Sequence, residues 1–224
     1  MSEKGIRSKR TEQLLRTKGN YGYGSDFLLG LVNSARLLLV AASNEGLPNH
    51  GENFLTLNGP AAIVVAVTAF EAFLNDILHL CLRTRTTNQE AFEQLASRDA
   101  FIEKFRDIPK LFAGGPELVN SDVVLAQHVR NEIVHFYPRS VGTTGVPEWL
   151  EALREKDLFY RIGSPPQDLD WTANMGSFQL ARWCASTVAG SARQFADALN
   201  ATAAKTMVAS RAESCAPYFR LLCI

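Results

Sequence analysis

Apolar residues recur along most of the chain with the three- and four-residue spacing of amphipathic helices. Residues 25–45 carry a broad apolar face, and residues 60–83 are apolar almost all round. A helix that is apolar all round is typical of the centre of a bundle. The remaining periodic stretches predict further helices over residues 87–113, 123–138, 147–156, 173–199 and 201–212.

Residues that favour helix ends punctuate this pattern. Thr87–Glu90 has the form of a capping box, and the following helix is expected to break near Ser97 and resume. Pro109 and the pair Gly114-Gly115 are expected to end it. Pro217 opens a final apolar tail, which we expect to dock onto the body of the protein or onto a partner.

The pattern predicts an all-α fold, an up-and-down bundle of four to five long helices with short additions. We expect a flexible basic arm over residues 1–24, the bundle over 25–200 and a helical tail over 201–224. The arm is expected to be solvated, although Tyr21 and Tyr23 could stack on RNA bases.

Composition narrows the function classes. The 224 residues are 46% apolar and 21% charged, and the formal net charge is zero. A neutral chain is not suited to coat duplex nucleic acid, but it can hold a short RNA segment through a local patch. No apolar leader segment and no apolar run long enough to span a bilayer is evident, so we expect a cytoplasmic protein without membrane contact.

Cysteine and histidine usage points away from metal sites. The four cysteines form no CxxC pair, which predicts buried thiols in a reducing compartment. The four histidines show no metal-ligand spacing beside Asp or Glu. The sequence therefore predicts neither a bound metal nor a cofactor.

The most informative stretch is residues 123–138, VVLAQHVRNEIVHFYP. Asn120 or Ser121 can cap the start of this helix, and Pro138 is expected to stop it. The apolar stripe is expected to consist of Val124, Val129 or Ala126, Ile133 and Phe136.

Polar residues with chemical potential lie near the end of this helix. Asn131 and His135 are four residues apart and share one face, whereas Arg130 is rotated from His135 by about 140°. One isolated helix would not direct Arg130 and His135 at the same point. A second chain, or a bend at Pro138, would be needed to bring them together. The helix C-terminus favours an imidazolium, and histidine can act as acid or base near neutral pH.

The run Arg130-Asn131-Glu132-Ile133-Val134-His135 resembles the Arg-x4-His motif of the HEPN superfamily of helical ribonucleases. The resemblance implies a metal-independent endoribonuclease with a toxin or antiviral-defence role, acting as a homodimer whose Arg and His residues face one cleft. It further implies that His135 is the general acid–base group, that Arg130 holds the phosphate, and that Asn131 positions the phosphate or the histidine.

Two further residues enter through the same resemblance. The segment AFEAFLNDIL is similar to a HEPN helix that carries an acidic residue, so Glu71 is a candidate to orient Arg130 or His135. A solvent-facing Glu71 is the alternative. Tyr137 matches a tyrosine that accepts AMP from a nucleotidyltransferase antitoxin in some HEPN toxins.

Other readings of the motif stay open at this point. The domain could be a non-catalytic HEPN-like module that binds a protein partner, or a helical sensor that binds a nucleotide. No GxGxxG, P-loop, GxSxG or HExxH motif supports a different enzyme class.

Overall fold

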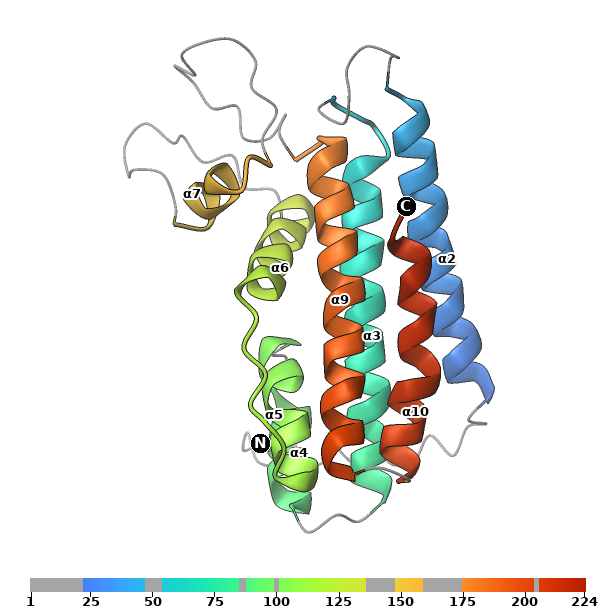
Figure 1. Ribbon diagram of the computed structural model, residues 1–224, viewed down its shortest axis with the longest axis vertical. Helices are drawn as coiled ribbons and strands as arrows, with labels where there is room; N and C mark the ends of the chain where they lie inside the picture. Colours follow the sequence, from blue (N-terminus) through green and yellow to red (C-terminus); the bar gives the residue numbers. More distant parts are fainter. Residues whose placement is uncertain are drawn as a thin grey trace, which may run out of the picture. The chain divides into compact units, whose positions relative to one another are not determined.

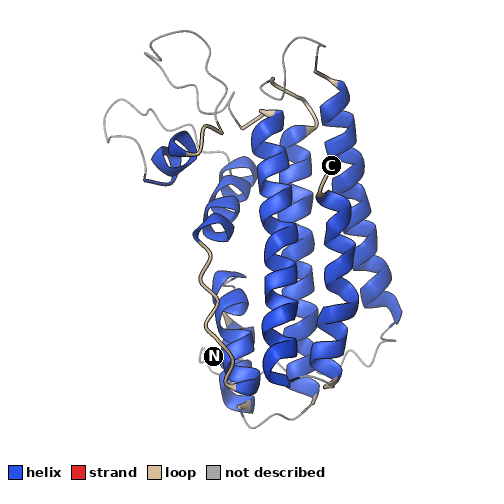
Figure 2. Cartoon of the chain, viewed as in Figure 1, coloured by secondary structure: helices blue, strands red, loops and turns tan. Residues whose placement is uncertain are grey.

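The computed structural model describes residues 22–46, 54–84, 88–98, 101–135, 148–158, 175–203 and 206–224 (Figure 1). Within these residues every regular element is helical, and the predicted all-α class is confirmed (Figure 2). An isolated antiparallel bridge joins Leu55 and Ser177. The helices are α2 (Gly22–Asn44), α3 (Gly59–Arg83), α4 (Gln89–Ser97), α5 (Phe101–Ala113), α6 (Ser121–Val134), α7 (Glu148–Glu155), α9 (Phe178–Ala203), α10 (Met207–Cys215) and the 3-10 helix η1 (Ala216–Leu222).

The chain forms two compact units, and α2, α3 and α9 contribute residues to both. Unit 1 takes the described residues up to Leu29, those within Phe70–Asn120 and those within Ser191–Tyr218. Unit 2 takes those within Gly30–Ala69, Ser121–Gly190 and Phe219–Ile224. The domain limits expected at residues 24 and 200 remain predictions, and most of the basic arm lies outside the described residues.

Aromatic side chains dominate the interior of unit 1. Phe70 packs edge-on against Phe101 and Phe105, with ring centroids 5.5 and 5.7 Å apart. Phe195 of α9 packs in the same way on Phe73, at 5.6 Å. All five rings are at most 3% exposed. Aromatic pairs of this geometry stabilise a core beyond the area that they bury.

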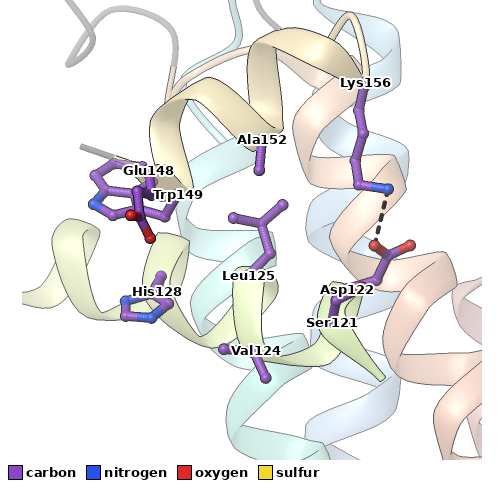
Figure 3. A pocket seen from close by; sticks show the side chains of 9 residues that line it. All are labelled: Ser121, Asp122, Val124, Leu125, His128, Glu148, Trp149, Ala152 and Lys156. Atoms are coloured by element: carbon purple, nitrogen blue, oxygen red, sulfur yellow. Dashed lines mark ion pairs between the residues drawn. The ribbon is translucent and has the colours of Figure 1, made fainter. Parts of the chain in front are cut away.

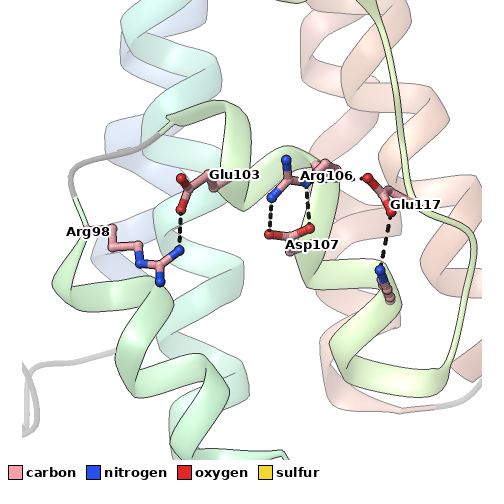
Figure 4. A network of polar contacts seen from close by, with 6 residues as sticks. Arg98, Glu103, Arg106, Asp107 and Glu117 are labelled. Atoms are coloured by element: carbon pink, nitrogen blue, oxygen red, sulfur yellow. Dashed lines mark hydrogen bonds and ion pairs between the residues drawn. The ribbon is translucent and has the colours of Figure 1, made fainter.

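Charged residues on α5 fasten the segment that follows it (Figure 4). Glu117 forms ion pairs with Arg106 at 3.6 Å and with Lys110 at 3.2 Å. Arg106 also binds Asp107, and these carboxylates raise the pKa of the guanidinium. Because all of these groups are partly exposed, the network positions the chain more than it stabilises it.

The predicted end of α5 is confirmed at the pair Gly114-Gly115 but not at Pro109. Pro109 lies inside α5, so the expectation that it ends the helix is wrong. The helix continues to Ala113, and Gly114 then takes a φ of +64°, a left-handed conformation that glycine adopts without strain. The Gly115 N–H donates to the Pro109 carbonyl at 3.2 Å and closes the turn.

The capping box expected at Thr87–Glu90 has a different register. Asn88 is the N-cap residue of α4, and its side chain makes no cap hydrogen bond. Its amide instead donates to the Leu111 carbonyl, on the far side of the α4–α5 hairpin. Thr87 itself lies outside the described residues. The predicted break near Ser97 is confirmed, since α4 ends at that residue.

Buried alanines recur along three helices of unit 2, beside larger apolar side chains such as Leu39 and Ile63. The three helices that build its core, α2, α3 and α9, contribute buried alanines at helical spacing. These are Ala35 and Ala42 of α2, Ala62, Ala66 and Ala69 of α3, and Ala181, Ala185 and Ala189 of α9. From the apolar tail, Phe219 and Leu222 are fully buried in this unit, as expected for a segment that docks.

A short clasp joins the starts of α3 and α9 in unit 2. The Thr56 N–H donates to the Gly176 carbonyl at 2.7 Å, and the Phe178 N–H donates to the Phe54 carbonyl at 2.9 Å. The rings of Phe54 and Phe178 stack at 5.2 Å. The Ser177 hydroxyl accepts from the Leu180 N–H at 3.1 Å, so α9 begins at Phe178 rather than near the predicted residue 173.

Glu45 attaches the end of α2 to the start of α3. Its carboxylate accepts hydrogen bonds from the backbone N–H groups of Leu57 and Asn58, just before α3 begins. Slight burial alone would raise the pKa of Glu45, but these hydrogen bonds outweigh it and lower the pKa. A carboxylate at this position also complements the positive end of the α3 dipole.

Three of the four cysteines are buried, as predicted, but Cys223 is exposed and the prediction for it is wrong. Burial raises the pKa of Cys81 to about 12 and also raises that of Cys184. Among the described residues no group of three His, Cys, Asp or Glu side chains is placed to hold a metal.

Among the described residues, α2 and α3 have the length and apolar composition to cross a membrane, in contrast to the expectation that no apolar run is long enough. The apolar window of α3 is 56% buried, as in the core helix of a soluble protein, whereas that of α2 is 28% buried. Leu37 of α2 is 67% exposed. The expected cytoplasmic location and lack of membrane contact remain predictions.

Candidate functional site

The motif helix α6 begins at Ser121, directly after the predicted cap Asn120, and ends at Val134. Its buried residues are Val123, Leu125, Ala126 and Val129. The expected stripe is therefore correct at Val129 and its alternative Ala126, but wrong at Val124 and Ile133, which are half-buried. Phe136 and the expected stop at Pro138 lie outside the described residues.

Arg130 and Asn131 interact directly in the last turns of α6. Arg130 Nη1 donates to Asn131 Oδ1 at 2.9 Å. Arg130 follows Val123 by seven residues and Ala126 by four, so it lies on the buried side of the helix. The whole residue is half-buried. The hydrogen bond fixes one edge of the guanidinium against the amide.

His135 is exposed one residue beyond the end of α6. Its N–H donates to the Asn131 carbonyl at 2.8 Å, which continues the helical pattern through this residue. His135 therefore follows Asn131 by one turn, at the negative end of the helix dipole. Within this chain the geometry keeps Arg130 and His135 on different sides of the helix, as the sequence predicted.

The two supporting residues, Glu71 and Tyr137, are not among those that the structure brings together at the end of α6. Glu71 is a half-buried residue of α3 that belongs to unit 1, whereas Arg130 and His135 belong to unit 2. Its role in orienting either of them remains a prediction. Tyr137 lies outside the described residues, and so does its role as an AMP acceptor.

A groove of about 510 Å³ lies between α6 and α7, within unit 2 (Figure 3). We call it the α6–α7 groove. Val124, Leu125 and Ala152 give it an apolar middle. Figure 3 shows the Glu148 carboxylate and the Trp149 ring beside His128 at one end of the groove. The other end carries an ion pair between Asp122 and Lys156, at 2.9 Å.

Hydrogen bonds to α9 hold α7 in place. Gln179 donates to the Asp157 carbonyl at 2.9 Å, and the Ser177 hydroxyl donates to the Leu158 carbonyl at 3.3 Å. Asp157 takes a φ of +55°, a conformation that Asp tolerates better than most residues, and ends the helix. The groove therefore has one wall on α6 and one on a short helix fastened at its C-terminal end.

His128, Glu148 and Trp149 were missed as candidate site residues. His128 belongs to α6, whereas Glu148 and Trp149 belong to α7. Only the packing of α7 on α6 brings them together. One signal was present in the sequence. His128 precedes His135 by seven residues, two helical turns, and so lies on the same side of the helix.

Comparison of the chain with protein-family models, with curated protein sequences and with solved structures gave no match.

Proposed function

We propose that this protein is a metal-independent endoribonuclease of HEPN type, in which Arg130, Asn131 and His135 act on one phosphodiester. The observation that carries the proposal is the arrangement at the end of α6. A hydrogen-bonded arginine and amide precede, by one turn, an exposed histidine at the negative end of a helix.

The chemistry needs one base and one acid. The imidazole of His135 removes the proton of the ribose 2′-OH, and the 2′-oxygen attacks the neighbouring phosphorus. The P–O5′ bond breaks, and the leaving oxygen takes up a proton from a His135 imidazolium. The products are a 2′,3′-cyclic phosphate and a 5′-hydroxyl. Histidine as a residue type can take either role near neutral pH.

Arg130 stabilises the extra negative charge on the phosphoryl oxygens in the transition state. Its planar guanidinium binds phosphate through paired N–H groups, and Asn131 sets the plane of that group. Since Arg130 and His135 lie on different sides of one helix, we propose a homodimer in which a two-fold axis brings the pairs of two chains to one cleft.

The test is cleavage of mixed RNA by the purified full-length chain, with and without EDTA. We expect cutting that EDTA does not change, and a loss of about 10²- to 10⁴-fold in His135→Ala, the usual range for general acid–base catalysis. His79→Gln is the control, because it removes a histidine of α3 that has no part in the proposed chemistry and should leave cutting unchanged. Full activity in His135→Ala at unchanged helical content would refute the proposal.

A non-catalytic HEPN-like interaction or nucleotide-sensing domain is the second candidate. Exposed large apolar side chains on α2, among them Leu37 and Val40, favour a protein partner. Absence of RNA cutting at every protein concentration would support this candidate. A nucleotidyltransferase-type antitoxin is the partner that the Tyr137 resemblance implies, and intact-mass measurement for added AMP after co-expression would test it.

A further inference from the structure

The α6–α7 groove has the size and lining of a small-ligand site, and the proposed phosphodiester chemistry does not use it. Its volume of about 510 Å³ lies within the range of ligand pockets in proteins. An apolar middle is combined with one aromatic side chain and a few polar groups at its ends. Such a lining suits a flat, largely apolar ligand that carries hydrogen-bonding groups on its rim.

The groove lies on the side of α6 that carries His135. His128 lines the groove and precedes His135 by two helical turns, which is about 10 Å along the axis. Val124 lines it one turn further toward the start of the helix. A strand of RNA whose phosphate meets His135 would therefore have a neighbouring nucleotide beside the groove.

The charges of the groove favour a base over a phosphate. Among the described residues that line it, Lys156 is the one lysine or arginine, and Asp122 neutralises it at 2.9 Å. Glu148 adds a negative charge at the end near Trp149 and His128 (Figure 3). Phosphate groups would be repelled there, whereas a neutral base with N–H groups would find an acceptor.

We infer that the α6–α7 groove binds one unpaired RNA base, with a preference for guanine, next to the phosphate that meets His135. The inference rests on the proposed function, since it takes single-stranded RNA as the ligand. Guanine presents two adjacent N–H donors on its Watson–Crick edge, and the two oxygens of Glu148 can accept both. Uracil presents one N–H between two carbonyl oxygens, which a carboxylate repels. Trp149 supplies the aromatic wall against which the base packs.

Binding can be measured without cleavage. Fluorescein-labelled 2′-O-methyl hexamers lack the 2′-OH nucleophile, so the full-length protein cannot cut them by the proposed route. We would compare an all-uridine hexamer with hexamers that carry a single guanosine, adenosine or cytidine, using fluorescence anisotropy. The guanosine hexamer should bind about tenfold more tightly than the all-uridine one, the discrimination typical of a bidentate contact.

Three variants test the groove, and one controls for α7. Glu148→Gln should reduce the guanosine preference to less than about threefold, and Trp149→Ala should weaken binding of every hexamer by about tenfold. Ala152→Leu keeps the side chains of Glu148 and Trp149 but fills the middle of the groove. It should also weaken binding of every hexamer by about tenfold. Glu155→Gln removes an exposed carboxylate of the same helix outside the groove and should change neither the affinity for the hexamers nor the guanosine preference. Circular dichroism verifies the helical content of each variant.

The outcomes separate the two proposals. If folded Glu148→Gln and Ala152→Leu both retain wild-type affinity and preference, the groove proposal fails, whatever the cutting assay shows. If no hexamer binds to the wild-type protein, the groove proposal fails as well. If the guanosine hexamer binds through the groove but His135→Ala cuts RNA normally, the groove proposal stands and the catalytic one falls.

Discussion

The two units of this protein build their interiors from different residues. Unit 1 packs five phenylalanine rings against one another, whereas α2, α3 and α9 carry columns of buried alanines in unit 2, beside larger apolar side chains. Helix α3 contributes to both, with Phe73 in the first and Ala66 in the second. The same helix therefore buries aromatic rings in unit 1, and in unit 2 it buries alanines together with Ile63 and Val67.

This difference decides which substitutions each unit tolerates. A ring removed from an aromatic cluster leaves a cavity, and its neighbours cannot fill it completely. A methyl group enlarged between close helices forces backbones apart or side chains off their rotamers. The candidate site lies in unit 2, on α6 and beside α7, so changes in the aromatic cluster should affect stability and leave the site chemistry intact.

The largest effect is expected for Phe73→Ala, which should lower the free energy of unfolding by about 3 to 5 kcal/mol. Phe73 is fully buried and packs on Phe195. Urea denaturation followed by circular dichroism measures the change. Phe27→Ala is the control in the same unit, because Phe27 is 64% exposed and its removal should matter by less than about 0.5 kcal/mol. Equal effects of the two variants would contradict the aromatic description of unit 1.

The reverse substitution tests unit 2. Ala66→Leu should lower the free energy of unfolding by about 1 to 3 kcal/mol, because Ala66 is fully buried and a larger side chain has to displace packed neighbours. Ala61→Leu enlarges an exposed alanine nearer the start of α3 and should change stability by less than about 0.5 kcal/mol. A neutral or stabilising Ala66→Leu would show that the alanine columns leave free space.

The sequence predicted a helix end well where residues of the same segment set it, and poorly where contacts with distant residues set it. Helix α3 was predicted within one residue at its start and at the same residue at its end, because its long apolar run and Pro60 are features of that segment alone. The start of α9 was placed five residues too early, because Ser177 and the pairing with residues 54–56 end the preceding segment. The capping box failed because Asn88 binds a carbonyl 23 residues away.

The candidate site divides in the same way. The helical placement of Arg130 and Asn131, and their divergence from His135, follow from spacing within one helix. The buried stripe was partly misassigned because Val124 lines the α6–α7 groove and stays half-buried, whereas Val123 and Leu125 are buried. The α6–α7 groove could not be predicted, since it depends on where a separate helix of eight residues docks.

A smaller effect is expected at the link between α2 and α3 in unit 2. Glu45→Ala removes the acceptor for two backbone N–H groups before α3 and should cost about 1 kcal/mol, as for a lost helix cap. Because the folded-state pKa of Glu45 is lowered, its contribution is present above its ordinary pKa of 4.5 and is lost as the pH falls through the folded value. Urea denaturation at pH 7 and at pH 3.5 should therefore show a larger difference between variant and wild type at pH 7.

The smallest effect is expected from His79 in unit 1. Burial lowers the pKa of His79, the charge of Arg83 lowers it further, and Asp76 opposes both. A histidine with a lowered folded-state pKa favours the folded state above its ordinary pKa of 6.5, and this stability is lost as the pH falls through the folded value. His79→Gln should therefore lose less stability than the wild type between pH 7.5 and pH 5, in urea denaturation at each pH. A steeper loss in the variant would reverse the sign of the argument and would place a stabilising imidazolium, rather than a neutral ring, in this part of unit 1.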